Sequence, residues 1–468
     1  MRPVLLVLAV GLAERHLTDP RFAQETPNLR SLRSDGCGAP LGAVLPAVTC
    51  SSQATLITGK MPAEHGVVGN GWYVREMGEP LLWRQPNEVV QAEKFYETAL
   101  HRDPSFTCAK IFWWWNMGAR VEWSVTPRPF YPADGSKILA IYGQPPSYPE
   151  ELETKLGKFP FFNFWGPKSG LESSRWLADA AIHTLEQQKP RLTMVYLPHL
   201  DYDHQRFGPD DERSITALSE LDGLIGDLRR AADRAGAALC VVSEYALEAA
   251  NQSIDINREL RRADLLEVRP TPKGEVLDVF ASKAFAVADH QIAHVYTKDP
   301  EATAAAARLL GGLAGVDQVL DRTGQREFGL DHERGGDLVA VADKGAWFTY
   351  YYWLEDAAQP DFAPTVDIHR KPGYDPAELF VDPKLKAPTL RVMRKLAQKK
   401  LGFRYLMDVV PTNADQVRGT HGRLPGTPEE GPTFLCSTPW SECGGEPDEA
   451  TIPATDFARR ALELINPA

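Results

Sequence analysis

Short runs of consecutive apolar residues alternate along the chain with longer segments in which apolar residues recur every three or four positions. The runs predict buried strands at Val4–Val10, Cys108–Trp114, Leu192–Leu197 and Ala238–Ser243. Helical spacing is clearest in Ser173–Gln188 and Asp211–Ala235, and each segment leads into one of these strands after a short loop. Buried strands that alternate with helices are typical of an α/β fold, a mainly parallel sheet with helices on both faces.

A shorter helix is predicted over Ser51–Thr58, after the stiff run Leu45–Val48 and Thr49 and before a glycine stop at Gly59. Thr49 stands at its first turn, where exposed N–H groups and the positive end of the helix dipole favour a phosphate. The Thr49 hydroxyl would then be aligned to attack phosphorus. Because Ser and Thr are also the commonest helix caps, an ordinary N-cap is the alternative.

Two stretches interrupt this alternation. Residues 115–170 are rich in Pro, Gly and aromatic residues, and we expect them to form an inserted lid. A second insertion at about 343–390 carries the aromatic run from Trp347 to Trp353. Such clusters are more often core than ligand platform, although a base-stacking surface is the alternative. We therefore expect one catalytic domain over residues 1–468, with these two insertions.

Composition narrows the range of partners. The 468 residues carry a formal net charge of -12, which argues against a nucleic-acid backbone as the main partner. The one basic run, Lys395 to Arg404, is interpreted as a solvated helix face. No apolar run approaches the ~20 residues that span a bilayer, so no membrane partner is expected.

The cysteines and the first residues bear on the cellular compartment. Six cysteines occur without a CxxC pair or metal-site spacing, so free buried thiols are favoured. Cys436 and Cys443 could pair if the compartment were oxidising. Arg2 and the apolar run after it resemble a short signal peptide, but a buried first strand is the preferred interpretation. The expected location is cytoplasmic.

Four short motifs follow one another in the stretch around Thr49. They are Pro46-Ala47-Val48-Thr49, Thr58-Gly59, Pro62-Ala63-Glu64-His65-Gly66 and Gly69-Asn70. Together they resemble the nucleophile region of the nucleotide pyrophosphatase/phosphodiesterase family, within the alkaline phosphatase superfamily. The resemblance implies an alkaline-phosphatase-like α/β fold with Thr49 as the nucleophile. It also implies that Asn70 hydrogen-bonds a phosphate oxygen and that His65 is structural.

The same resemblance points to a metal centre. Phosphoryl transfer in the superfamily depends on two clustered divalent ions, and Asp and His ligands suit zinc. The segment after the third strand and the Thr-His-Gly near the C-terminus place Asp201 and His421 on ligand positions of one ion. The family histidine that completes this set aligns with Gln205, and the adjacent His204 is the alternative ligand.

The second ion keeps fewer of its ligands. Val10-Gly11 stands where the family has an Asp-Gly pair, and the next acid along the chain is Glu14. Glu244 replaces an aspartate and Tyr245 replaces a histidine. Glutamate ligates metals through oxygen, whereas a neutral tyrosine is a poor ligand. We therefore expect one or two divalent ions, with zinc as the preferred metal.

Two further segments are candidates for compensating or substrate-binding residues. Asp289, His290 and His294 lie around a short apolar strand, on which the two histidines share one side. The alternative is a buried, hydrogen-bonded His294 behind a strand-entry turn. Asp367 and His369 lie in a turn-rich segment, which suits either a structural bend or a phosphate contact from the basic residues that follow.

These features favour a metal-dependent hydrolase of small phosphate esters that acts through a phosphothreonine intermediate on Thr49. Asn70 would stabilise negative charge on the transferring group. Val10, Gln205 and Tyr245 motivate the alternative, a family member that binds a phosphorylated ligand without hydrolysing it. A cofactor-binding α/β module is disfavoured, because neither GxGxxG nor GxxxxGK[ST] follows a predicted strand.

Overall fold

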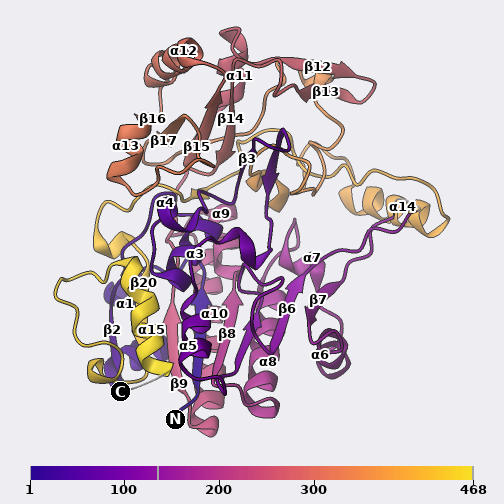
Figure 1. Cartoon of the computed structure of the whole chain (residues 1–468). Helices are drawn as coiled ribbons and strands as arrows, with labels where there is room; N and C mark the ends of the chain where they lie inside the picture. Colours follow the sequence, from indigo (N-terminus) through magenta and orange to yellow (C-terminus); the bar gives the residue numbers. More distant parts are fainter. Residues whose placement is uncertain (1, 134–135, 466–468) are drawn as a thin grey trace.

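The predicted apolar runs form the centre of one large sheet in the computed structural model, which describes residues 2–133 and 136–465 (Figure 1). Neighbours β9, β1, β8, β5 and β6 are parallel, while β20 and β7 run antiparallel to the strands beside them. The mainly parallel sheet is therefore confirmed. Its eight strands lie in the order β2 (Cys37–Pro40), β20 (Thr433–Cys436), β9 (Ala238–Val242), β1 (Val4–Ala9), β8 (Leu192–Leu197), β5 (Cys108–Ile111), β6 (Trp123–Pro127) and β7 (Ile141–Gln144).

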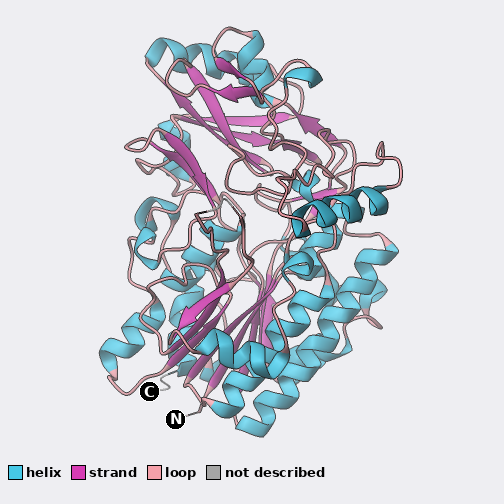
Figure 2. Ribbon diagram, turned by 90° about the vertical axis from the view of Figure 1, so that its right-hand side faces the viewer, coloured by secondary structure: helices cyan, strands magenta, loops and turns pink. Residues whose placement is uncertain are grey.

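Helices cover both faces of this sheet, as predicted (Figure 2). On one face α2 (Pro27–Asp35), α8 (Leu171–Gln187) and α10 (Glu212–Ala235) form a layer in which α10 contacts the other two. On the other face α3 (Thr49–Thr58), α5 (Phe95–Arg102) and α15 (Phe457–Ile465) contact one another. Shorter helices lie in the connections: α1 (Arg15–Thr18), α4 (Pro62–His65), α6 (Tyr148–Leu156), α7 (Phe161–Phe164) and α9 (His199–Phe207).

One predicted strand is shorter than expected. The apolar run from Cys108 to Trp114 leaves the sheet after Ile111, the last residue of β5. Phe112 has a left-handed backbone conformation with φ 62°, and Trp115 follows with φ 58°. Because these conformations turn the backbone, the aromatic residues after β5 form a buried loop rather than more strand.

The segment 115–170 adds to the large sheet. Strands β6 and β7 extend the sheet beyond β5, and α6 and α7 follow them. Proline enters these strands only at Pro127, the last residue of β6, which pairs with Ile141 of β7 beyond the residues that pair with β5.

A second, smaller sheet lies beyond the carboxyl ends of the large sheet's parallel strands (Figure 1). Its antiparallel strands are ordered β14 (Ala284–Asp289), β15 (Ile292–Thr297), β17 (Leu338–Ala342) and β16 (Val316–Leu320). Helices α11 (Ile256–Arg262), α12 (Pro300–Gly311) and α13 (Arg322–Glu327) accompany it. Two-stranded ladders complete the fold: β3 (Gly71–Val74) with β4 (Glu79–Leu82), β10 (Glu248–Ala249) with β19 (Gly419–Thr420), β11 (Gln252–Ile254) with β18 (Ala346–Phe348), and β12 (Val268–Thr271) with β13 (Gly274–Leu277).

The aromatic run that begins at Trp347 is core. Its six aromatic side chains are at most 2% exposed, so the structural interpretation holds and no open stacking platform is formed. The six cysteines are free and buried. The Sγ atom of Cys443 lies 3.2 Å from that of Cys37.

A buried ion cluster holds the segment that follows this run. Lys371 is 1% exposed, and its Nζ lies 2.7 Å from a carboxylate oxygen of Asp375 and 2.7 Å from one of Glu378. Trp165 Nε1 donates to the other Glu378 oxygen at 2.6 Å. This cluster fixes the position of Tyr374, which lies between the two sheets.

Replacing Lys371 by Met tests how strongly this cluster stabilises the fold. The substitution leaves two carboxylates buried without their cation, so we expect the free energy of unfolding in urea to fall by about 3–5 kcal/mol. Lys158→Met is the matched control, because Lys158 is 85% exposed and pairs with Glu153 at the surface. That control is expected to change stability by about 0.5 kcal/mol or less. Equal losses in the two variants would contradict the assignment.

Candidate active site

Thr49 lies beyond the carboxyl ends of the parallel strands, as the first residue of α3. The residue before it, Val48, is extended (φ -132°), and the helix ends at Gly59 in the left-handed conformation, as predicted. Thr49 is 4% exposed, and its Oγ1 lies 3.2 Å from the hydroxyl oxygen of Tyr245. Tyr245 follows β9, so the nucleophile candidate and the replaced metal ligand are in direct contact.

Asn70 joins the start of α3 to the second sheet. Its Oδ1 accepts a hydrogen bond from the Cys50 backbone N–H at 2.9 Å. Its own backbone N–H and its Nδ2 donate to the two carboxylate oxygens of Asp289, at 2.9 and 3.1 Å. The Nδ2 group carries two hydrogens, so one remains for a phosphate oxygen.

Asp201 lies in the first turn of α9, directly after β8. Gln205 Nε2 donates to Asp201 Oδ2 at 2.6 Å, and the Tyr374 hydroxyl donates to Gln205 Oε1 at 2.8 Å. Residues four apart share a helix face, which explains why Gln205 is the partner. Burial raises the pKa of Asp201 to about 7, although Gln205 and Tyr245 oppose the rise.

Four aromatic rings form a column above Thr49. Successive centroids are 3.7 Å apart for Tyr245 and His421, 3.7 Å for His421 and His290, and 3.8 Å for His290 and Tyr374. Burial lowers the pKa of both histidines, so each ring is neutral at pH 7. The column of uncharged rings therefore begins at Tyr245, the ring whose hydroxyl contacts the nucleophile.

The tautomers of the two central rings follow from their hydrogen bonds. His421 Nδ1 donates to the Ala47 carbonyl at 2.7 Å, and His290 Nδ1 lies 2.8 Å from Asp289 Oδ1. Each Nδ1 therefore carries the proton, and each Nε2 presents a lone pair. Neither Nε2 has a hydrogen-bond partner among the described residues.

Glu244 is a buried acid beside Gln53, Thr49 and Tyr245. It is 3% exposed, and neither of its carboxyl oxygens has a hydrogen-bond partner in the part of the chain that the structure describes. Burial raises its pKa well above the usual range; Gln53 opposes the rise, and the charge of Asp201 adds to it. Buried polar atoms without partners are uncommon in native proteins, so Glu244 is a candidate contact for a polar ligand.

These residues do not fit a two-ion centre. Within the described ranges, no three side chains among His, Cys, Asp and Glu are arranged to hold a metal ion. Asp201 Oδ1 and His421 Nε2 remain 3.9 Å apart, but a catalytic zinc site uses three protein ligands. Glu14 does not replace the missing acid near Val10, because it pairs with Arg33 and accepts a 2.6 Å hydrogen bond from Thr433.

Two predicted candidates lie elsewhere. His204 is next to Gln205 on α9 but points to another side of the helix, where its ring centroid is 5.7 Å from that of His16. It is therefore not the alternative partner of Asp201. His369 is exposed in a loop, and none of its described contacts reaches Thr49. Spacing along the sequence defines neither the side of α9 on which His204 lies nor the place of the His369 loop in the fold.

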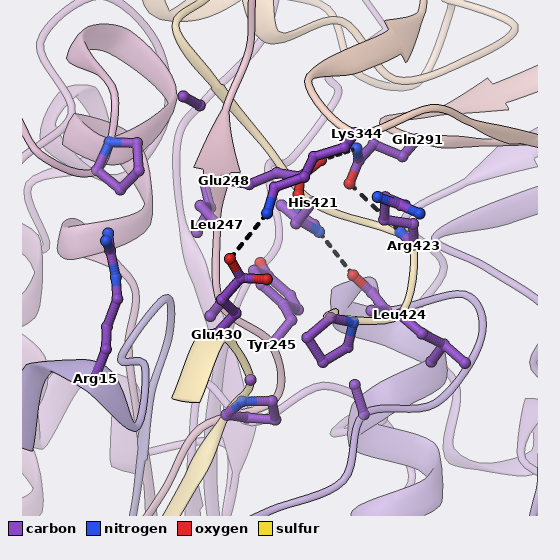
Figure 3. A pocket seen from close by; sticks show the side chains of 18 of the residues that line it. Arg15, Tyr245, Leu247, Glu248, Gln291, Lys344, His421, Arg423, Leu424 and Glu430 are labelled. Carbon is purple, nitrogen blue, oxygen red and sulfur yellow. Dashed lines mark hydrogen bonds and ion pairs between the residues drawn. The ribbon is translucent and has the colours of Figure 1, made fainter. Parts of the chain in front are cut away.

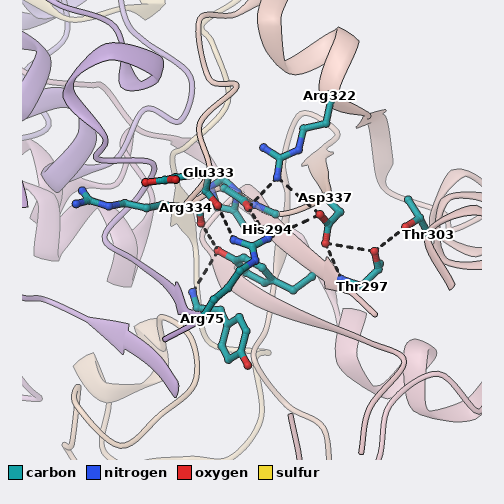
Figure 4. A network of polar contacts seen from close by, with 12 residues as sticks. Arg75, His294, Thr297, Thr303, Arg322, Glu333, Arg334 and Asp337 are labelled. Carbon is teal, nitrogen blue, oxygen red and sulfur yellow. Dashed lines mark hydrogen bonds and ion pairs between the residues drawn. The ribbon is translucent and has the colours of Figure 1, made fainter. Parts of the chain in front are cut away.

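The single strand predicted around Asp289 is wrong. The structure has a hairpin, in which β14 ends at Asp289 and β15 begins at Ile292. His290 occupies the turn with φ 57°, so it faces His421, while His294 lies on β15 inside the second sheet. His294 Nε2 donates to the Val68 carbonyl at 2.8 Å and its Nδ1 accepts from Gly336 N–H at 3.1 Å. It is a core histidine within a network of structural contacts (Figure 4).

A cavity of about 210 Å³ reaches the ring column from one side (Figure 3). Tyr245 and His421 line it, whereas Thr49 does not. Its cationic wall is already paired, since Lys344 Nζ lies 2.8 Å from Glu430 Oε1 and Arg15 Nη1 lies 3.0 Å from Asp210 Oδ1. A phosphate that reaches Thr49 from this side must displace Tyr245 or His421.

Sequence reasoning missed Tyr374 as part of this site. Tyr374 closes the ring column and also bonds Gln205, through a segment far along the chain. The turn-rich composition between Asp367 and Pro376 was the only signal, and it does not distinguish a ligand loop from a structural bend.

Comparisons with known proteins agree with this fold. Residues 4–375 match the family described as type I phosphodiesterase / nucleotide pyrophosphatase. An uncharacterized pyrophosphatase/phosphodiesterase of Schizosaccharomyces pombe is 24% identical over 204 residues, which is 43% of this chain, and the chain spans 36% of the length of that relative.

Two solved structures resemble the whole chain. Phosphonoacetate hydrolase from Sinorhizobium meliloti 1021, in complex with phosphonoacetate, has a TM-score of 0.63 at 16% identity and is matched over 99% of this chain and 96% of that one. An inactive murine ectonucleotide pyrophosphatase / phosphodiesterase 5 in complex with AMP has a TM-score of 0.59 at 14% identity. The match covers 100% of this chain and 95% of that one. At these identities the likeness establishes the alkaline-phosphatase-like fold.

The role of His294 predicts a pH dependence. Burial lowers its pKa to about 4 from a usual value of 6.5. Between these values the unfolded chain binds a proton that the folded chain does not, so stability falls as pH falls from 6.5 to 4. In His294→Gln this contribution disappears, and the slope of the unfolding free energy across the window decreases by up to about 1.4 kcal/mol per pH unit. His101→Gln, at a side chain 58% exposed, is expected to keep the wild-type slope.

Proposed function

This chain belongs to the type I phosphodiesterase / nucleotide pyrophosphatase family, and on that premise we propose that it hydrolyses small phosphate esters, including nucleotides, with Thr49 as the nucleophile. One observation carries the proposal. The Thr49 hydroxyl stands at the first residue of α3, where a phosphate is favoured, and it contacts the hydroxyl of Tyr245. The match of the murine relative in complex with AMP supports a nucleotide as one substrate class.

The reaction proceeds in two displacements. Thr49 Oγ1 attacks phosphorus, the bond to the ester oxygen breaks, and the Thr49 proton moves to the carboxylate of Glu244. Glu244 accepts this proton in its carboxylate form, which the neighbouring Gln53, Thr49 and Tyr245 favour and burial opposes. Water then attacks the phosphothreonine and releases phosphate, and the Thr49 hydroxyl is restored. The proton on Glu244 passes to the leaving ester oxygen. Of the two protons of the attacking water, one returns to Thr49 Oγ1 and the other leaves with the phosphate product.

Two further groups stabilise charge. The free N–H of Asn70 Nδ2 donates to a non-bridging phosphate oxygen, and Asp289 holds that amide in place. Tyr245 donates its hydroxyl proton to Thr49 Oγ1 as negative charge develops there. Tyr245 thereby contacts the nucleophile at a position where the wider family has a metal-binding histidine.

The family is typically metal-dependent, and zinc is the metal that the Asp201 and His421 pair would prefer. The replacements at Val10 and Tyr245 do not suit a second ion, so each step above is assigned to side chains of the chain itself. Metal content is accordingly part of the test.

A second candidate function is binding of a phosphorylated ligand without hydrolysis. The observation that favours it is the closed ring column, which leaves Thr49 4% exposed, together with the replaced ligands. Hydrolysis is favoured over this candidate because Thr49, Asn70 and Glu244 converge although they lie far apart in the sequence.

The nucleophile is tested with a chromogenic phosphodiester, bis(p-nitrophenyl) phosphate, with metal content measured on the same samples. Thr49→Ala removes the attacking oxygen, so we expect the rate to fall about a thousandfold or more. Thr58→Ala is the matched control, at the far end of the same helix, and it is expected to retain activity. If wild type is active and Thr49→Ala equally so, the nucleophile is another group. Phosphate binding without turnover in wild type would establish the second candidate instead.

Tyr245→Phe isolates the hydroxyl that contacts Thr49. The aromatic stack with His421 remains, so we expect kcat to fall about a hundredfold with a small change in KM. Tyr148→Phe serves as the control, because it removes a buried hydroxyl that contacts Thr184, far from the site. Unchanged kcat in Tyr245→Phe would remove the hydroxyl from the mechanism.

A further inference from the structure

Helix α14 (Pro388–Lys400) presents an apolar side to solvent. Leu390 is 67% exposed, Met393 61% and Leu396 48%. With Ala397, which is also exposed, these side chains lie three or four residues apart and form one stripe along the helix. Figure 1 shows α14 standing away from both sheets, so neither sheet covers this stripe.

Two cations of α14 face the segment that follows the helix. Asp408 accepts ion pairs from Arg391 and from Lys395, whose Nζ lies 3.0 Å away. A surface helix of a globular protein ordinarily has the opposite arrangement, with apolar residues toward the core and charges toward water. The two ion pairs thus fix the helix with its apolar stripe outward.

The apolar surface continues past the end of the helix. Leu401 is 72% exposed, Phe403 65% and Leu406 40%. Singly exposed apolar residues are ordinary on protein surfaces, but a contiguous row of large ones marks an interaction site. The basic run Lys395–Arg404, interpreted from sequence as a solvated helix face, therefore belongs to a surface that also exposes apolar side chains.

Positive charge surrounds this stripe. Residues 384–404 contain eight Lys and Arg residues and no Asp or Glu, in a chain whose net charge is -12. Arg394 and Lys400 are exposed on the helix itself, beside the apolar side chains. Long basic side chains at the border of an apolar stripe extend their charged ends toward lipid headgroups while their methylene groups stay in the apolar layer.

We propose that α14 and the residues that follow it, 384–406, form a docking surface for a membrane that contains anionic lipids. The helix would lie in the interface plane with Leu390, Met393 and Leu401 inserted and the cations on the headgroups. It does not cross the bilayer; among the described residues, no helix has the length and apolar character needed to do so. The excess of cations without acids favours an anionic lipid surface over the apolar groove of a protein partner.

Vesicle sedimentation of the full chain tests this proposal. We expect the protein to sediment with phosphatidylcholine vesicles that contain phosphatidylserine and to remain in the supernatant with phosphatidylcholine alone. Added salt is expected to weaken binding, because the attraction of cations to anionic headgroups is screened. The proposal is overturned if the protein sediments equally with both kinds of vesicle. It is also overturned if the protein sediments with neither kind.

Two double variants separate the apolar and electrostatic contributions. Leu390→Ser with Met393→Ser is expected to weaken vesicle binding about tenfold or more. Arg394→Glu with Lys400→Glu is expected to weaken it at least about fivefold for each charge removed. The side chains are exposed, so folding is expected to be retained, which circular dichroism and thermal unfolding check.

Met77→Ser is the matched control, because Met77 is 66% exposed on the β3–β4 hairpin, outside the proposed surface. It is expected to bind vesicles as wild type does. Binding that both double variants retain in full contradicts the assignment to α14. Sedimentation velocity without vesicles tests whether a second copy of the chain covers the stripe. If wild type is a dimer and the double variant Leu390→Ser with Met393→Ser is a monomer, a second copy covers the stripe and the lipid proposal is wrong.

Discussion

The hydrogen bonds between Asn70 and Asp289 are the constraint on which the candidate site depends. Asn70 orients the first turn of α3 through the Cys50 amide, and Asp289 belongs to the second sheet. Because Asp289 also contacts His290, the same carboxylate that fixes the start of the nucleophile helix places the ring column over it. The two sheets therefore meet at one polar junction, and a shift of either would move Thr49 relative to its neighbours.

Burial controls the chemistry at this junction. It raises the pKa of Asp201 and Glu244 and lowers the pKa of His290 and His421, so each group is driven toward its uncharged form. A bound cation would reverse this for the carboxyls, but the ligands of a second ion are replaced by Val10 and Tyr245. The site consequently holds its polar groups by hydrogen bonds and ring stacking, which gives Tyr245 direct access to the nucleophile.

The surface formed by α14 differs from the junction in which side chains are buried and which are exposed. At the junction polar groups are buried, and several of them have no hydrogen-bond partner among the described residues, whereas on α14 apolar groups are exposed and Asp408 pairs with Arg391 and Lys395. The two regions share no contact among those described, and each uses local charge to set an orientation. This separation allows a surface contact to be made without rearranging the residues around Thr49.

The sequence alone determined the elements whose signals are local. Apolar runs located β1, β8 and β9 because buried parallel strands are apolar on both faces, and Gly59 located the end of α3 because the left-handed stop favours glycine. It also supplied Thr49, Asn70, Asp201 and His421 as candidates through the motif resemblance. Only the tertiary structure decided that Gln205 and not His204 meets Asp201, that a hairpin turn separates His290 from His294, and that Tyr374 completes the column. These outcomes depend on side-chain direction and on contacts between distant segments, which the order of residues along the chain does not specify.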